Sequence, residues 1–66
     1  MNEKTFQLID SLLTIGKDNR QMALNVMDNG EKGGDIQIAS EIIGHRFCLN
    51  PNKIIDWYNE RKTRLL

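Results

Sequence analysis

The segment Ile43–Arg64, IGHRFCLNPNKIIDWYNERKTR, is the most informative part of this 66-residue chain for predicting its fold. Asn50 and Pro51 predict the start of a helix, because an asparagine side chain caps a first turn and proline fits the first helical position. The side chains that then recur on one face of this helix are Ile54, Trp57 or Tyr58, Arg61 and Leu65. The segment therefore predicts a C-terminal helix that begins directly after a short turn.

The same segment has the residues that two helices need to pack at a steep angle across a tight turn. The first helix needs a small residue where the second crosses it, and Gly44 takes that position. The positions expected to point inward are all apolar: Ile43, Phe47, Leu49, Ile54 and Trp57. The start of the second helix, residues 50–53, is polar and is expected to remain exposed.

In this pattern residues 40–61, about a third of the chain, resemble the helix-turn-helix family of DNA-binding proteins. Within that family they are similar to the small three-helix and homeodomain-like members. Cys48 departs from the family pattern, because a glycine able to adopt a positive φ is usual there, so strain or a slightly different turn is expected. Gly44 departs as well, since alanine is commoner and glycine lowers helix propensity by about 1 kcal/mol.

The resemblance implies a transcription regulator that places the helix of residues 51–64 in the major groove of DNA. The outward residues expected at base edges are Asn52, Lys53, Asp56 and Asn59. The residues expected to bind phosphates are His45, Arg46, Arg61, Lys62 and Arg64. Two alternatives stay open: Asp56 is simply a solvated helix residue, and the last three cations complement the helix dipole.

The rest of the chain predicts an all-α fold, a small bundle of about four short helices that ends in the helix-turn-helix-like pair. Apolar spacing predicts a first helix over residues 3–15, ended by Gly16. Asp18 is expected to cap a second helix, with Gln21 completing a capping box. One domain, residues 1–66, would comprise a helical hairpin (1–29), a Gly-rich loop (30–34) and the helix-turn-helix-like unit (35–66).

The boundaries around the Gly-rich loop rest on local signals. Asn29-Gly30 is interpreted as the end of the second helix, with a hairpin turn as the alternative. Asp35 is expected to cap a third helix, on which Ile36, Ala39 and Ile43 recur at helical spacing. The alternating residues 35–40 also permit a strand, but the helical pattern is longer.

The formal net charge is zero, which counts against nucleic acid, but the charge is unevenly distributed. Residues 1–44 carry a net charge of −3 and residues 45–66 a net charge of +3. The lone Cys48 permits no internal disulfide, and neither a signal peptide nor a membrane-spanning segment is recognised. A cytoplasmic protein is expected.

Catalytic and metal-binding patterns are weak. His45 and Cys48 lie three residues apart, but zinc needs three or four ligands and no other His or Cys exists. The pair also lacks the orienting group that a nucleophile requires. Trp57 and Tyr58 could stack on nucleic-acid bases, yet their spacing with Ile54 favours a place in the core. We expect that the protein is not an enzyme and that it binds neither a metal nor a cofactor.

The expected partner is double-stranded DNA, bound by a homodimer because one short reading helix makes few phosphate contacts. The N-terminal helices would supply the dimer contact through Phe6, Leu13, Met22 and Met27. The alternative function is a small modulator of a host protein, an inhibitor or adaptor of the kind that phages and mobile elements encode. Such a modulator would make no nucleic-acid contact.

Overall fold

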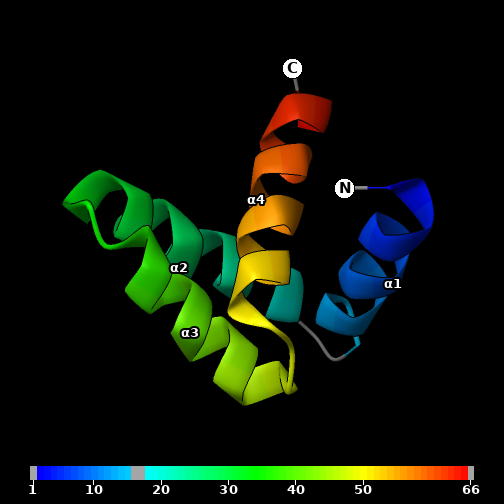
Figure 1. Ribbon diagram of the computed structural model, residues 1–66, viewed down its shortest axis with the longest axis horizontal. Coiled ribbons are helices and arrows are strands. Elements are labelled where there is room, and N and C mark those ends of the chain that lie inside the picture. Colours follow the sequence, from blue (N-terminus) through cyan, green and yellow to red (C-terminus); the bar gives the residue numbers. More distant parts are fainter. Residues whose placement is uncertain (1, 16–17, 66) are drawn as a thin grey trace.

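The computed structural model describes residues 2–15 and 18–65, and of residue 65 only the backbone. Its helices are α1 (Glu3–Leu13), α2 (Asn19–Gly33), α3 (Ile36–Phe47) and α4 (Pro51–Leu65), and the described residues contain no strand. The predicted all-α bundle is confirmed. Figure 1 shows α2 and α3 lying side by side, with α4 crossing in front of them and α1 on the other side of α4.

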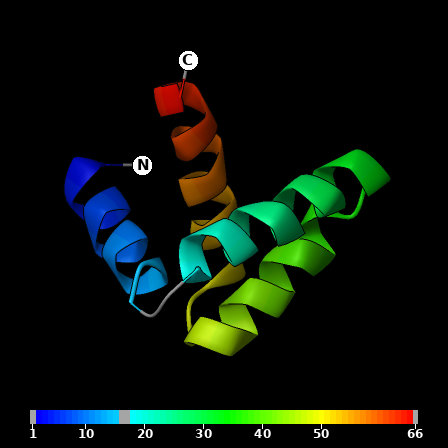
Figure 2. The ribbon, with the colours of Figure 1, turned by 180° about the vertical axis from the view of Figure 1, so that it is seen from behind.

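One hydrophobic core receives side chains from every helix. Trp57 and Tyr58 of α4 are its largest fully buried members. The other buried apolar residues within the described ranges are Phe6, Ile9, Leu13, Ala23, Met27, Ala39, Ile43 and Ile54. Seen from behind, α2 covers the first turns of α4 (Figure 2). Because each helix is short and amphipathic, its apolar stripe is buried only when the four helices pack together.

The predicted loop over residues 30–34 is wrong, because α2 continues through Gly33. A Cβ added at Gly30 would lie 2.5 Å from the Cβ of Ala39, so glycine allows α2 and α3 to approach closely. Gly34, with a φ of 77°, ends the helix and donates its backbone N–H to the carbonyl of Glu31 at 3.2 Å. The connection between α2 and α3 is therefore only Gly34 and Asp35, and neither a hairpin turn at Asn29-Gly30 nor a strand over residues 35–40 forms.

The helical hairpin also lies elsewhere than predicted. It is α2 and α3 that pack most extensively on each other, whereas α1 makes fewer contacts with α2 (Figure 1). The sequence pattern placed the hairpin over residues 1–29 because the glycines after Asn29 were interpreted as a break. Because α2 extends to Gly33, the two-residue connection of Gly34 and Asp35 joins α2 directly to α3.

Two of the predicted helix caps are wrong in their chemistry. Asp18 and Asp35 do precede α2 and α3, but neither carboxylate accepts a capping hydrogen bond. Asp18 has a left-handed φ of 67° and Asp35 has a ψ of 41°, whereas a capping side chain needs an extended backbone. Gln21 donates to Asn25 instead of closing a capping box.

The first helix begins at a cap that the sequence pattern did not identify. Asn2 has an extended backbone, and its Oδ1 accepts from the backbone N–H of Thr5 at 2.8 Å. The helix ends at Leu13, two residues before the predicted end. The predicted stop at Gly16 lies outside the described residues.

Candidate nucleic-acid interface

The turn between α3 and α4 is fixed by a close backbone approach at Gly44. Its carbonyl accepts from the N–H of Leu49 at 2.9 Å, and a Cβ at Gly44 would lie 2.5 Å from the carbonyl oxygen of Leu49. Cys48 has a φ of 57° and a ψ of 44°, the left-handed conformation that a glycine would adopt more easily. The predicted crossing glycine and the predicted unusual cysteine turn are both confirmed.

The start of α4 is capped as predicted. The Oδ1 of Asn50 accepts from the backbone N–H of Asn52 at 2.8 Å. The carbonyl of Asn50 also accepts from the N–H groups of Lys53 and Ile54. The bonds from Asn52 and Lys53 satisfy amide groups that a helix start otherwise leaves without partners, and the bond from Ile54 is the first regular bond of the helix.

The positions predicted to point inward do so. Ile43, Ile54 and Trp57 have no exposed surface. Phe47 and Leu49 are partly buried and pack against the core. The α3–turn–α4 unit is therefore held together by the apolar contacts that its spacing predicted.

Trp57 and Tyr58 attach α4 to the other helices through their polar atoms as well. The indole Nε1 of Trp57 donates to Oδ1 of Asp10 on α1 at 3.1 Å. The hydroxyl of Tyr58 donates to Asp28 on α2. Burial and the two nearby carboxylates, of Asp28 and Glu31, raise the pKa of Tyr58. Both rings belong to the core, so neither offers a stacking surface for bases.

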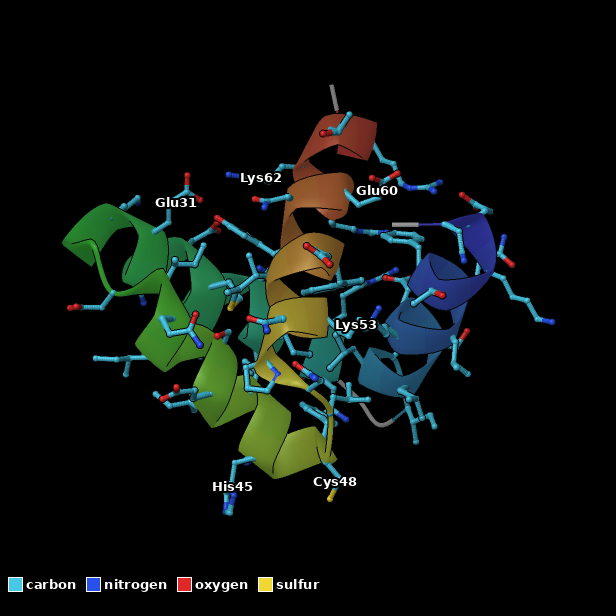
Figure 3. All side chains as sticks on the ribbon, in the orientation of Figure 1. Glu31, His45, Cys48, Lys53, Glu60 and Lys62 are labelled. Atoms are coloured by element: carbon cyan, nitrogen blue, oxygen red, sulfur yellow. The ribbon has the colours of Figure 1, made fainter. Side chains whose placement is uncertain are left out.

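The opposite face of α4 is free. The four residues predicted at base edges are all exposed: Asn52, Lys53, Asp56 and Asn59. None of these side chains makes a hydrogen bond or ion pair within the part of the chain that the structure describes. Figure 3 shows Lys53 on the first turns of α4, on the side toward α1. This face is polar, close to neutral and open to a ligand.

The three cations at the end of α4 bind carboxylates of the protein itself. Arg61 lies 3.6 Å from Asp10. Lys62 donates to both carboxylate oxygens of Glu31, at 3.0 and 2.8 Å. Figure 3 shows Lys62 and Glu31 directed toward each other. These cations tie α4 to α1 and α2, and the long sequence separations explain why the sequence pattern did not reveal the pairs.

Arg64 is the third of these cations. It donates to Glu3 and lies 3.6 Å from Glu60, while its Cζ is 4.0 Å from the centre of the Phe6 ring. The hydrogen bond from Arg64 lowers the pKa of Glu3, and the one from Lys62 lowers the pKa of Glu31. A phosphate at any of these cations would compete with a carboxylate, and phosphate binding by Arg61, Lys62 and Arg64 stays a prediction.

The two remaining predicted phosphate ligands lie at the end of α3. His45 and Arg46 are exposed, and no described residue forms a hydrogen bond or ion pair with either side chain. His45 borders a shallow hollow between the end of α3 and the start of α4, together with Cys48 and Pro51. Figure 3 shows His45 and Cys48 pointing away from the body of the protein. Among the described residues, no three His, Cys, Asp or Glu side chains gather as metal ligands would.

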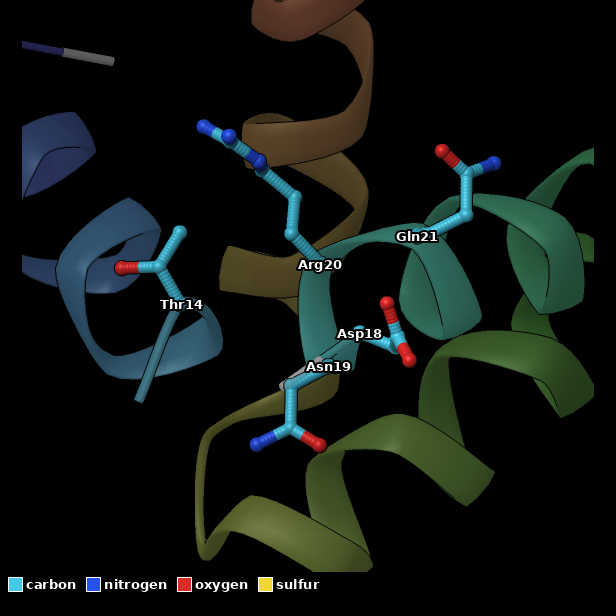
Figure 4. Close-up of a pocket in the computed structure, with 5 residues that line it drawn as sticks. All are labelled: Thr14, Asp18, Asn19, Arg20 and Gln21. Atoms are coloured by element: carbon cyan, nitrogen blue, oxygen red, sulfur yellow. The ribbon is translucent and has the colours of Figure 1, made fainter. Parts of the chain in front are cut away.

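A second hollow, of about 250 Å³, lies between the end of α1 and the start of α2 (Figure 4). Its lining is polar: Thr14, Asp18, Asn19, Arg20 and Gln21. Thr14 donates its hydroxyl to the carbonyl of Ser11. The hollow thus presents one carboxylate and one guanidinium, and the described residues place no nucleophile beside a base there.

The residues predicted to form a dimer contact on the N-terminal helices are not available for it. Phe6, Leu13 and Met27 are buried in the core, and Met22 is partly buried against it. Their helical spacing marked the inside of the bundle and not an outer face. Among the side chains that the structure describes, the exposed large apolar residues are Leu8, Ile15, Ile38 and Ile42.

The chain matches no family model, no curated protein and no solved structure. No helix in the described part of the chain is long and apolar enough to span a membrane.

Proposed function

We propose that the protein is a small DNA-binding regulator that inserts α4 into the major groove. The observation that carries this proposal is the division of α4 into two faces. Ile54, Trp57 and Tyr58 fix one face to the bundle, while the opposite face has four exposed polar side chains without partners among the described residues. A rigidly held helix with an unoccupied polar face is what base recognition requires.

The chemistry of that face suits base edges. Asn52 and Asn59 can each donate to and accept from an adenine, and Lys53 can donate to the acceptors of a guanine. Asp56 can accept from the amino group of a cytosine, which offsets its repulsion by phosphates. Asn52 and Lys53 share the first turn of α4, and Asp56 and Asn59 follow on the next two turns, so the four would meet neighbouring base pairs.

The phosphate contacts would be few. Arg61, Lys62 and Arg64 are engaged with carboxylates, which leaves Lys53, His45 and Arg46 as the nearest basic residues without such partners. Two or three phosphate contacts for each chain give a salt dependence of log K on log salt of about −2 to −3. Duplex binding is therefore expected to be weak and to disappear at moderate salt.

The test is fluorescence anisotropy of a labelled random duplex, titrated with the protein over a series of salt concentrations. We expect Lys53→Ala to weaken binding and to flatten the salt slope by about one unit. Lys32→Ala is the matched control, because Lys32 is exposed near the end of α2 and away from the start of α4. Absence of any duplex binding at low salt, or equal effects of the two variants, would overturn the proposal.

Recognition of a particular DNA sequence is tested by a second measurement. Selection of duplexes from a random pool should enrich a short motif for the native protein. Asn59→Ala should relax the preference at one position of that motif by about 1–3 kcal/mol. Because Asn59 is exposed and its side chain bonds to no described residue, the variant should keep the stability of the native protein.

A second candidate function is that of a modulator of another protein, an inhibitor or adaptor without nucleic-acid contact. It is favoured by Leu8, which is 63% exposed on the outer side of α1. Under this function, Leu8→Asp should abolish co-purification with a host protein while Lys53→Ala has no effect. A protein that co-purifies with nothing and binds duplex in a salt-dependent way would exclude it.

A further inference from the structure

An apolar stripe runs along the outer side of α3. Ile38 and Ile42 lie one helical turn apart, and each is 55% exposed. They border a shallow hollow between α2 and α3, of about 280 Å³, which Val26 and Ala39 line as well. No described part of the chain covers these two isoleucines, although removing their apolar surface from water would be favourable.

Charges of opposite sign stand at the two ends of this stripe. Asp35 precedes Ile38 by three residues and lines the hollow, and Arg46 follows Ile42 by four residues. Asp35 lines the hollow between α2 and α3, and so does Ala39, which lies two helical turns before Arg46 on the same side of α3. Both charges therefore lie on the edge of the stripe toward α2. Both side chains are exposed, and neither has a hydrogen bond or ion pair within the described ranges.

We propose that this surface, defined as the α3 stripe (Asp35, Ile38, Ile42 and Arg46), is the contact between two copies of the chain. The copies pair their α3 helices antiparallel about a two-fold axis that passes between Ile38 and Ile42. Ile38 then meets Ile42 of the second copy, and Asp35 meets Arg46 of the second copy. The symmetry makes each contact twice.

Charge complementarity selects a second copy as the occupant. In the antiparallel register, the acidic end of each stripe faces the basic end of the other, and the helix dipoles are opposed as well. A parallel register would place like charges against each other. The stripe is thus complementary to itself, which a contact with an unrelated protein does not require.

The proposal goes beyond DNA binding and does not depend on it. It does assign Arg46 to the second copy, so Lys53 on α4 and His45 at the end of α3 remain as the basic residues of each chain that could contact a duplex. The surface is small relative to a standard interface of about 800 Å² on each partner, so the dimer is expected to be weak. Pairing would nevertheless bring two α4 helices into one assembly, which doubles the contacts with a duplex.

The first experiment measures the mass of the protein in solution by sedimentation equilibrium over a concentration series that reaches about 1 mM, a range that suits a weak interface. We expect a reversible monomer–dimer equilibrium for the native chain and a monomer for Ile42→Asp. Ile38→Gln is a milder second variant, in case Ile42→Asp does not fold by circular dichroism. Leu8→Asp is the matched control, because it removes an exposed apolar residue from α1 and should leave the dimer intact.

The second experiment reverses the charges. Asp35→Arg alone and Arg46→Asp alone should each raise the dissociation constant about three- to tenfold, and the double variant should restore it. If the two charges serve only the dipole of α3, the double variant should be the least stable of the set and should recover no association.

Several outcomes would overturn the proposal. The first is a native chain that remains a monomer at about 1 mM. The second is a dimer that persists in both the Ile42→Asp and the Ile38→Gln variants. A native monomer that instead captures another protein through Ile42 would identify a different occupant. Duplex binding is measured separately, and a monomeric Ile42→Asp variant that still binds duplex, more weakly, leaves the function in place.

Discussion

The indole Nε1 of Trp57 donates to Oδ1 of Asp10 at 3.1 Å across 47 residues of sequence. The same carboxylate lies 3.6 Å from Arg61 and 3.7 Å from Arg20. Asp10 therefore joins α1 to α2 and to α4 at one point. The Trp57 ring has no exposed surface in the folded protein, and this partly exposed carboxylate is the acceptor for its N–H.

Replacing Asp10 should destabilise the bundle more than replacing a free carboxylate. Asp10→Ala leaves a buried indole N–H without a partner, and we expect a loss of about 1–3 kcal/mol in the free energy of unfolding. Asp10→Asn should lose less, because an amide oxygen still accepts. Urea unfolding followed by tryptophan fluorescence measures both, with the exposed Asp56→Ala as a control expected within about 0.5 kcal/mol of native. Equal effects of Asp10→Ala and Asp56→Ala would contradict the role of Asp10.

Two glycines should respond in opposite ways to alanine. At Gly44 the added Cβ would lie 2.5 Å from the carbonyl oxygen of Leu49, so Gly44→Ala should cost about 1–3 kcal/mol. At Gly33 the nearest atom would be 3.8 Å away, so Gly33→Ala should gain up to about 1 kcal/mol from helix propensity. Thermal melting of the two variants checks the difference, and stabilisation by Gly44→Ala would mean that the turn is looser than described.

Cys48→Gly should stabilise the protein. Cys48 has a φ of 57° and an exposed side chain, so glycine removes a conformational cost of about 1–2 kcal/mol without losing core contacts. Part of that gain is offset by the greater freedom of glycine in the unfolded chain. A rise of the melting temperature for Cys48→Gly and a fall for Cys48→Val are expected, and the reverse order would refute the left-handed turn.

Stability should fall in alkaline solution because of Tyr58. Its pKa is raised in the folded protein, chiefly by burial and then by its hydrogen bond to Asp28. The unfolded chain loses this proton near pH 10, the ordinary pKa of tyrosine, while the folded protein keeps it to higher pH. Stabilisation is therefore complete below about pH 10 and decreases above it.

The control for this pH dependence is Tyr58→Phe, which should lack the alkaline decrease assigned to Tyr58. The chain has a single tyrosine, so the absorbance of tyrosinate reports this group alone. Titration of the folded protein at the ordinary tyrosine pKa would show that the hydroxyl is accessible to water, contrary to its burial.

Alanine substitutions at Asn50 and Asn52 should have different effects, the first on the stability of the fold and the second on the affinity for duplex DNA. Asn50→Ala removes the cap of α4 and should cost about 1 kcal/mol of stability. The side chain of Asn52 is exposed, so Asn52→Ala should change stability little and duplex affinity more. Chemical unfolding and anisotropy titration of both variants test this, and a large loss of stability in Asn52→Ala would count against a free reading face.

The accuracy of the sequence predictions follows the distance over which each interaction acts. The turn at Cys48 and the cap at Asn50 depend on residues that are close in the chain, and both were predicted. The loop over residues 30–34 was not, because the low helix propensity of glycine is outweighed by packing of Gly30 against Ala39 in another helix. The caps at Asp18 and Asp35 failed because side-chain type does not specify the backbone angles that capping needs.

The predictions for the candidate interface also succeeded where they depended on spacing within one helix and failed where they depended on contacts between helices. The exposure of Asn52, Lys53, Asp56 and Asn59 could be predicted from helical periodicity, because residues opposite the buried stripe of a helix face solvent. The carboxylate partners of Arg61, Lys62 and Arg64 do not follow from it, because each pair except Arg64–Glu60 joins different helices. A cation's availability to a phosphate depends on such partners, so periodicity alone overestimated the basic surface.

Four amphipathic helices, the capped start of the last helix and the residues of its buried stripe were predictable from the residues alone, since these depend on backbone preferences and on spacing along a helix. The pairing of α2 with α3, the contacts of Asp10 with two other helices and the exposure of Ile38 and Ile42 became apparent only in the folded protein. Those features depend on which faces meet when separate helices pack, and a pattern along one helix does not specify the helix that it will contact.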